Sequence, residues 1–457
     1  MVDFTLTFPA GFLWGATTAA HQVEGGNAPN TWAAWEQKPG SIHQGQRAGL
    51  ACDWWGGRYA EDLDRAAALG HNAHRFSVEW SRIEPERGKF DGKAIAHYAD
   101  MIAALRARHM EPLLTLHHFT DPLWIAEQGG WLNPDTAHRF ARFAQIVAEE
   151  LGGGLTMWCT INAPLVYAMQ GYWLGRFPPG ERSLGHALDA AEGLLRGHAA
   201  AYAAIKRVQP GAQIGLAARQ ISLLARRPSW LHGPARNRLR RLFNRAFVEA
   251  LLTGELRFLR RTVVVPEARD TLDWIGLNAG SRFVAGFNLL KPRQAFVEHT
   301  PPRHGLLEPE GGGEIWPEGL FEQIRWLAER TGKPIYITEH GVPDAGDALR
   351  PLVLVRGLRS VWQALNYNFP VKGYFYRTLV DGFEWANGYD PRLRWGLFAC
   401  DPQTQARTPR RSAGLYGEVC AANALTMDMV RRYLPDEADA LFPGVPVQRE
   451  VTLRPRL

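Results

Sequence analysis

The chain has 457 residues, a net charge of +6 and an apolar fraction of 46%. No apolar run in the sequence is long enough to span a membrane, and no nucleic-acid recognition motif accompanies the positive charge, so we expect neither kind of partner. Basic residues are densest from Arg226 to Arg245, where apolar residues at helical spacing predict the solvated face of a helix. The first residues lack a signal-peptide pattern, which predicts a cytoplasmic protein.

Cysteine spacing excludes the common metal motifs. Cys52, Cys159, Cys400 and Cys420 form no CxxC or Cys/His pair, so we expect free or buried thiols, no metal and no cofactor. The 17 Trp residues suit a protein that stacks on sugar rings, although tryptophan also fills cores.

Eight strand-like runs alternate with helical patterns along the chain, and this alternation favours a parallel barrel. In order, the runs are Phe12–Thr18, Ala73–Ser77, Glu111–Leu116, Leu155–Ile161, Gln213–Ala217, Leu272–Leu277, Pro334–Thr338 and Val371–Tyr376. Amphipathic stretches between them predict helices at Ile95–Arg108, Thr136–Leu151, Leu184–Val208, Leu320–Thr331 and Leu349–Asn366. Length alone would allow two or three domains, but a barrel with long loops reaches this size as one, so we expect residues 1–457 to form a single domain. The Pro- and Gly-rich stretch Lys291–Gly313 is expected to be a long loop near the active face.

The seventh run ends in a carboxylate. Ile335 to Thr338 is typical of a buried strand, Glu339 follows it, and Gly341 permits a turn. Barrel enzymes place their chemistry at the carboxyl ends of strands. From this stretch alone, Glu339 is either a catalytic carboxylate or one half of a structural ion pair.

Several motifs occur together in a fixed order: Phe12–Gly25, His74–Ile83, Thr160–Pro164, Tyr336–Gly341 and Phe383–Tyr389. Together they resemble glycoside hydrolase family 1, the retaining β-glucosidases. The resemblance covers nearly the whole chain. It implies a single (β/α)8 barrel and retaining cleavage of β-linked sugars through a covalent intermediate on Glu339.

The same resemblance implies roles for further residues. Arg75 would lie beside the nucleophile, where a cation favours an ionised carboxylate. Gln22, His118, Asn162 and Glu384 would hydrogen-bond sugar hydroxyls, and Trp385 would stack on the ring. Further positions in the family's pocket are Phe119, Asn278 and Arg377. Phe119 and Arg377 each stand where the family has Trp.

Position 163 departs from the family pattern. The family has Asn-Glu-Pro, whose Glu is the general acid/base, whereas this chain has Asn162-Ala163-Pro164. A retaining glycosidase uses two carboxyl groups roughly 5–5.5 Å apart, and losing the acid typically removes about two to four orders of magnitude for leaving groups that need a proton. Ala163 is either an engineered exchange or a natural loss. Glu79, Glu36 and Asp121 are candidates to replace the missing group.

Other departures favour natural divergence. Gly280 and Gly313 stand where the family has Tyr and Trp, so the pocket should be wider. Arg377 offers a fork of donors, which suggests an acidic or acylated sugar; an ion pair of Arg377 with Glu384 or Asp381 would explain it equally well.

The leading hypothesis is a retaining β-glycosidase impaired in ordinary hydrolysis, acting on a small carbohydrate. Donors with good leaving groups, transfer reactions and acidic sugars are alternatives. A carbohydrate-binding protein without catalysis is the hypothesis of a different class. The oligomeric state is left open.

Overall fold

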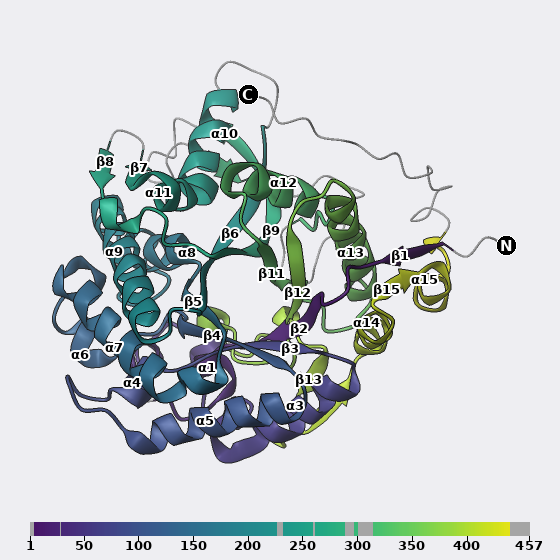
Figure 1. Ribbon diagram of the computed structural model, residues 1–457, viewed down its shortest axis with the longest axis horizontal. Helices are drawn as coiled ribbons and strands as arrows, with labels where there is room; N and C mark the ends of the chain where they lie inside the picture. The colour runs from purple at the N-terminus through teal and green to yellow at the C-terminus, as the bar shows by residue number, and fades with distance from the viewer. Residues whose placement is uncertain are drawn as a thin grey trace.

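Eight parallel strands close into a barrel whose axis runs toward the viewer in Figure 1. The computed structural model describes residues 4–27, 29–225, 232–258, 261–287, 297–299 and 314–438. The strands follow one another around the barrel as β9-β11-β12-β2-β3-β4-β5-β6, and the pairing of β6 with β9 closes it. Their bounds are β2 (Leu13–Thr17), β3 (Ala73–Ser77), β4 (Glu111–His117), β5 (Met157–Asn162), β6 (Gln213–Ala225), β9 (Trp274–Phe287), β11 (Ile335–His340) and β12 (Val371–Arg377). The predicted (β/α)8 fold is confirmed.

Helices surround this barrel, as the ring of coils in Figure 1 shows. They are α1 (Ala20–Val23), α2 (Thr31–Trp35), α3 (Tyr59–Ala68), α4 (Trp80–Ile83), α5 (Gly92–Ala107), α6 (Leu123–Ala126), α7 (Asp135–Leu151), α8 (Pro164–Ala168), α9 (Leu184–Val208), α10 (His232–Arg240), α11 (Ala246–Thr253), α12 (Gly319–Thr331), α13 (Arg350–Asn366), α14 (Arg411–Ala422) and α15 (Met427–Tyr433). The predicted helices coincide with α5, α7, α9, α12 and α13 to within a few residues. Each buries the apolar stripe from which it was predicted.

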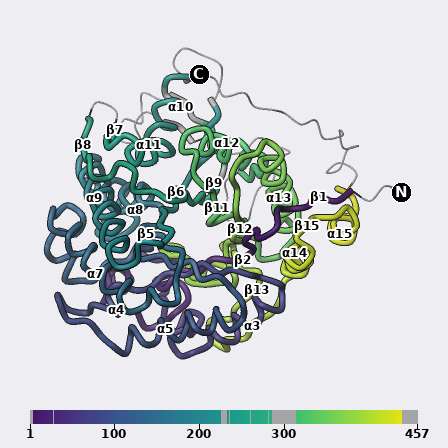
Figure 2. The backbone as a smooth tube through the Cα atoms, viewed as in Figure 1, coloured from purple at the N-terminus to yellow at the C-terminus, as the bar shows by residue number. Residues whose placement is uncertain are grey.

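Short strands lie outside the barrel. They are β1 (Thr5–Thr7), β7 (Glu255–Phe258), β8 (Arg261–Val264), β10 (Val297–His299), β13 (Phe398–Cys400), β14 (Arg407–Pro409) and β15 (Ala424–Thr426). β1 pairs with β15, so the start of the described chain lies beside α15, as the tube in Figure 2 also shows.

Two strands are much longer than predicted. The fifth and sixth runs were expected to end at Ala217 and Leu277, but β6 and β9 continue to Ala225 and Phe287 and stay paired beyond the barrel. β10 adds to β9 in antiparallel fashion. Apart from β10, the predicted loop Lys291–Gly313 lies outside the described residues, Gly313 included.

The barrel interior is apolar at one end and polar at the other. A layer of buried side chains fills the amino-terminal end: Ala73, Leu113, Met157, Cys159, Ala217, Trp274 and Phe375. Because successive side chains of a strand alternate between faces, Arg75 also points inward, one layer above Ala73. The apolar layer therefore supports a polar layer at the carboxyl ends of the strands, where barrel enzymes carry their sites.

The cysteines and the basic region were also the subject of sequence-based predictions. All four cysteines are free and buried. Part of the basic region, from α10 onward, is helical. Of the apolar residues whose spacing predicted this helix, Leu239, Leu242, Phe247 and Leu251 are buried and Phe243 is half-buried. Among the described residues, no helix combines the length and apolarity needed to cross a bilayer.

Candidate active site

Glu339 stands at the carboxyl end of β11 between two arginines. Its Oε1 accepts a hydrogen bond from Arg75 Nη1 at 3.0 Å, and its Oε2 lies 3.5 Å from Arg377 Nη1. The pairing of β11 with its neighbours is irregular between Ile337 and Glu339. Such an irregularity redirects side chains, and here it occurs at the residue whose orientation matters most.

Arg75 is fully buried on β3, and its guanidinium is held from several directions. Besides Glu339, it donates to Asn162 Oδ1 at 2.8 Å and to Thr115 Oγ1 at 3.2 Å. Burying an unpaired charge would be very unfavourable, so these bonds fix both the cation and the carboxylate.

Asn162, at the end of β5, joins the elements of the site. Its Oδ1 accepts from Arg75 Nη2 and from Asn278 Nδ2, both at 2.8 Å, and its Nδ2 donates to His118 Nε2 at 2.8 Å. Burial, with the nearby cations Arg75 and Arg377, holds the pKa of His118 well below its usual value. The neutral imidazole is therefore the acceptor that this bond requires. Thr338 Oγ1 completes the series by donating to Asn278 Oδ1 at 2.8 Å.

A cavity of about 200 Å³ opens above this network, and we call it the central chamber. It brings together all the predicted site residues except Arg75, which lies beneath Glu339: Gln22, His118, Phe119, Asn162, Ala163, Asn278, Glu339, Arg377, Glu384 and Trp385. They come from six barrel strands or from the segments that directly follow them, which no local pattern in the sequence connects.

The aromatic wall of the central chamber is built around Trp385. Its ring stacks near His21 and His118, with interplanar angles of 14° and 22°, and meets the edge of Phe119. Gln22 donates through Nε2 to Phe383 O at 3.0 Å, which holds the amide against the segment that carries Trp385. A flat wall beside oriented amides suits a sugar ring with its hydroxyls.

Arg377 binds carboxylates of the protein itself. Its Nη2 donates to Glu384 Oε2 at 3.0 Å, Nη1 approaches Glu339, and the guanidinium lies 4.4 Å from the centre of the Trp395 ring. The alternative partner, Asp381, instead pairs with Arg410 at 2.6 Å. The sequence-based argument from Arg377 to an acidic sugar is therefore not supported, because the charge of Arg377 is used internally.

Glu384 is buried beside that arginine. Burial raises the pKa of Glu384 to about 7, although Arg377 opposes the shift. Of the described residues that line the central chamber, the carboxylates are Glu384 and Glu339.

Ala163 lies at the wall of the central chamber and offers no functional group. It is the N-cap of α8, has a left-handed backbone (φ 42°), and its N–H donates to Ala217 O at 2.7 Å. The side chain is buried. Position 163 thus faces the chamber in which a family acid/base would act.

The proposed replacements for that acid/base are wrong. Glu36 accepts from His21 and Ala48, Asp121 accepts from His117 and Trp131, and Glu79 accepts from Ser81. None of the three lines the cavities beside Glu339. Burial, together with Glu24, raises the pKa of Glu79 to about 7, but this group belongs to a separate buried network with Tyr98 and Arg82.

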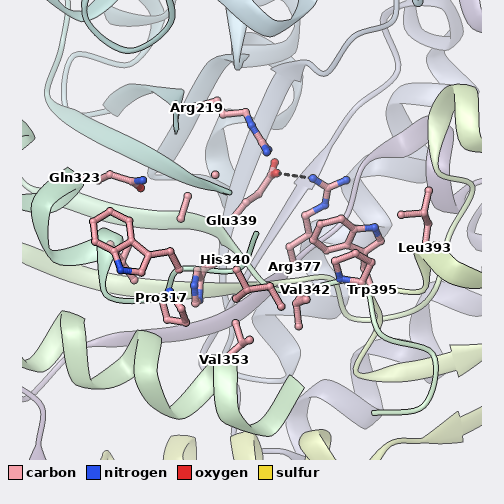
Figure 3. A pocket seen from close by; sticks show the side chains of 17 residues that line it. Arg219, Pro317, Gln323, Glu339, His340, Val342, Val353, Arg377, Leu393 and Trp395 are labelled. Carbon is pink, nitrogen blue, oxygen red and sulfur yellow. Dashed lines mark ion pairs between the residues drawn. The ribbon is translucent and has the colours of Figure 1, made fainter. Parts of the chain in front are cut away.

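A second cavity of about 220 Å³, the side chamber, borders Glu339 on the β9 side. Gly280 and Trp316 contribute to its wall, together with Gln323 and His340, which Figure 3 labels. A Cβ on Gly280 would lie 2.4 Å from Gln220 O, so no larger residue fits on this backbone without a shift of β6. The expected loss of bulk at this position thus coincides with an additional cavity.

Arg219 lines both chambers, and the sequence analysis missed it. It follows the apolar end of the fifth predicted run, just as Arg75 and Arg377 stand near the ends of theirs. Figure 3 shows its side chain directed toward Glu339 from a different side than Arg377. Attention to a charged residue after a buried strand would have identified it.

No group of three or more His, Cys, Asp or Glu residues suited to a metal ion occurs within the described ranges.

The chain matches the family model for glycosyl hydrolase family 1 over residues 4–425. A 1,4-beta-D-glucan glucohydrolase of Thermotoga neapolitana is 30% identical over 92% of this chain and 99% of that protein. A beta-glucosidase of Agrobacterium sp. is 31% identical over 91% of this chain and 95% of that protein. A beta-galactosidase of Sulfolobus acidocaldarius is 29% identical over 93% of this chain and 97% of that protein.

Solved structures agree with these relatives. A beta-glycosidase from Pyrococcus horikoshii has a TM-score of 0.86 at 33% identity, covering 95% of this chain and 99% of that one. A beta-glucosidase from Thermotoga maritima in complex with glucoimidazole has a TM-score of 0.85 at 29% identity, covering 92% and 100%. The resemblance drawn from the sequence motifs is confirmed: the chain belongs to glycosyl hydrolase family 1.

Proposed function

We propose that Glu339 is the nucleophile of a retaining β-glycosidase that works without a carboxylic acid at position 163. The observation that carries this proposal is the composition of the central chamber. It is lined by Glu339, which Arg75 binds, by the residues expected to bind a sugar, and by Ala163, which the resemblance matches to the family's acid/base. We further propose that the barrel acts as one domain.

In the first step, Glu339 attacks the anomeric carbon and displaces the leaving group. Gln22, His118 and Glu384 would hold the sugar hydroxyls while Trp385 packs on the ring. Without an acid, the leaving group must depart as an anion, so activated glycosides are favoured and ordinary alkyl glycosides react about two to four orders of magnitude more slowly.

The second step lacks a base to activate water. The glycosyl-Glu339 intermediate should therefore persist or pass its sugar to a strong nucleophile. Transfer and slow hydrolysis are both consistent with this chamber.

A carbohydrate-binding protein without catalysis is the second candidate, and Ala163 is the observation in its favour. The networked pair of Arg75 and Glu339 favours catalysis, since binding alone does not require a cation on a nucleophile.

Covalent labelling tests the proposal. A 2-deoxy-2-fluoro-β-glucoside with a dinitrophenyl leaving group needs no acid catalyst, and the fluorine slows breakdown of the intermediate. We expect the protein mass to increase by one fluorosugar, located on the peptide that contains Glu339. A Glu339→Gln variant should remain unlabelled. Absence of labelling with both gluco- and galacto-configured reagents would favour the binding protein.

A further inference from the structure

Arg219 is directed toward Glu339 at the centre of the site, but among the described residues it forms no ion pair with that carboxylate. Within the described part of the chain, the structure gives its guanidinium no hydrogen bond and no ion pair, whereas Arg75 and Arg377 each bind at least one carboxylate. The side chain is partly buried and borders both chambers. A cation withdrawn from water without a counter-ion is unfavourable, and it is a strong attraction for an anion.

The surroundings of Arg219 strengthen that attraction. Burial, with the positive charge of Arg377, lowers the pKa of Arg219, and Glu339 only partly opposes the shift. An anion that entered the central chamber would offset the unfavourable free energy of burying this charge. A neutral ligand would leave it in place.

Arg219 also stands next to the position that lacks its acid. Ala163 N–H donates to Ala217 O, and Arg219 is two residues further along β6, on the same face of the strand. Ala163 and Arg219 both line the central chamber. The unpaired cation therefore lies on the side of the chamber where the family's acid would meet the leaving group.

We propose that Arg219 binds the carboxylate leaving group of a β-glycosyl ester, so that the donor class of this site is the 1-O-acyl β-glycosides. This inference rests on the proposed function. Attack of Glu339 Oε on the anomeric carbon forms one C–O bond and breaks the bond from that carbon to the acyloxy oxygen. The electron pair leaves with the carboxylate, which requires no proton. The same donor then explains both why position 163 needs no acid and why Arg219 faces the central chamber.

The geometry of the guanidinium suits this leaving group. Its fork of N–H donors matches the two oxygens of a carboxylate, whereas a phenolate presents one oxygen. In the second step, an acceptor alcohol or water attacks the anomeric carbon of the glycosyl-Glu339 intermediate. The carboxylate still held by Arg219 takes the acceptor's proton and leaves as the free acid. The net reaction converts ester and alcohol into glycoside and carboxylic acid.

The test compares two donors whose leaving groups are similarly acidic, 1-O-benzoyl-β-glucose and 2,4-dinitrophenyl β-glucoside, with methanol as acceptor. Variants are Arg219→Met, Arg219→Lys and, as a charge-matched control, Arg330→Met, which removes an exposed arginine of α12 that lines neither chamber. Product analysis shows which bond breaks, because cleavage at the sugar carbon gives methyl glucoside and benzoate, whereas acyl transfer gives methyl benzoate. Thermal melting verifies that each variant folds.

We expect Arg219→Met to reduce kcat/KM for the benzoyl donor by about ten- to hundredfold relative to the dinitrophenyl donor, the range of a charge-assisted bidentate contact. Arg219→Lys should show a smaller loss, and Arg330→Met should show none. Equal losses for the two donors, or methyl benzoate as the product, would overturn the inference. An unmodified protein that is labelled at Glu339 but does not use the ester also overturns it, while the proposed function stands. Failure of labelling overturns both.

Discussion

The two sides of Glu339 differ in how their residues are held. On the sugar side, Arg75, Asn162, Asn278 and His118 each bond at least one other member of the network, directly beneath the central chamber. On the leaving-group side, Ala163 has no functional group and Arg219 has no partner among the described residues. A side chain embedded in a network cannot be replaced without leaving its partners unsatisfied, whereas one at the edge can. The departure at position 163 lies on the side where a change disturbs the fold least.

The largest effect should come from restoring the missing group. Ala163→Glu should raise hydrolysis of poorly activated glucosides by about 10²–10⁴-fold, because the new carboxylate can protonate the leaving group and later activate water. Steady-state assays with nitrophenyl and alkyl β-glucosides measure this gain. In the unmodified protein, added azide should instead give a glycosyl azide. If neither change produced turnover, the leaving-group side would not be the only part that has diverged.

Removing a hydrogen-bonding residue from the sugar side should lower stability as well as activity. Asn162→Ala removes the acceptor of Arg75 and Asn278 and the donor to His118, so it leaves several buried polar groups unsatisfied. We expect a loss of about 2–4 kcal/mol in the free energy of unfolding, together with loss of Glu339 labelling. Arg219→Met is the matched comparison and should leave the free energy of unfolding unchanged or slightly higher. Equal destabilisation of the two variants would refute the proposed difference between the sides.

A smaller effect should appear in the pH dependence of stability. The pKa of Glu384 is about 7 in the folded protein because of burial, and its ordinary value is 4.5, so the folded state binds the proton more tightly. The contribution of Glu384 to stability is therefore greatest below pH 4.5 and declines until about pH 7. Relative to Glu384→Gln, the native protein should lose roughly 1–3 kcal/mol between pH 5 and pH 8.

Urea unfolding at both pH values measures this difference. Arg219→Met removes no group that titrates in this range, so its difference from the native protein should stay constant with pH. A constant difference for Glu384→Gln as well would show that burial does not perturb Glu384.

The sequence predicted the barrel well because its signals are local and repeated. Runs such as Ala73–Ser77 are buried throughout and end in polar residues, and helices such as α9 carry an apolar stripe over their whole length. The motifs also placed Gln22, Glu339 and Glu384 in one chamber. These predictions needed only strand order and the rule that strand ends meet on one face.

The errors concern properties that depend on neighbours distant in the sequence. Glu79, Glu36 and Asp121 looked available as carboxylates, but partners from other segments bind each of them. For Arg377 the sequence left a sugar contact and an internal ion pair open, and the structure shows the ion pair with Glu384. Arg219 attracted no notice, and it forms no ion pair among the described residues. Whether a charge is satisfied depends on the three-dimensional set of contacts, which periodicity does not encode.

The short reach of position 163 has an evolutionary consequence. Ala163 lines the central chamber but makes no hydrogen bond through its side chain. We therefore expect a mutation at this one codon to change which donors react while the nucleophile and its supports stay in place. Selection could thus convert a hydrolase into a transferase, or back again, without passing through an unfolded ancestor. The same independence makes position 163 a natural starting point for directed evolution of glycoside synthesis.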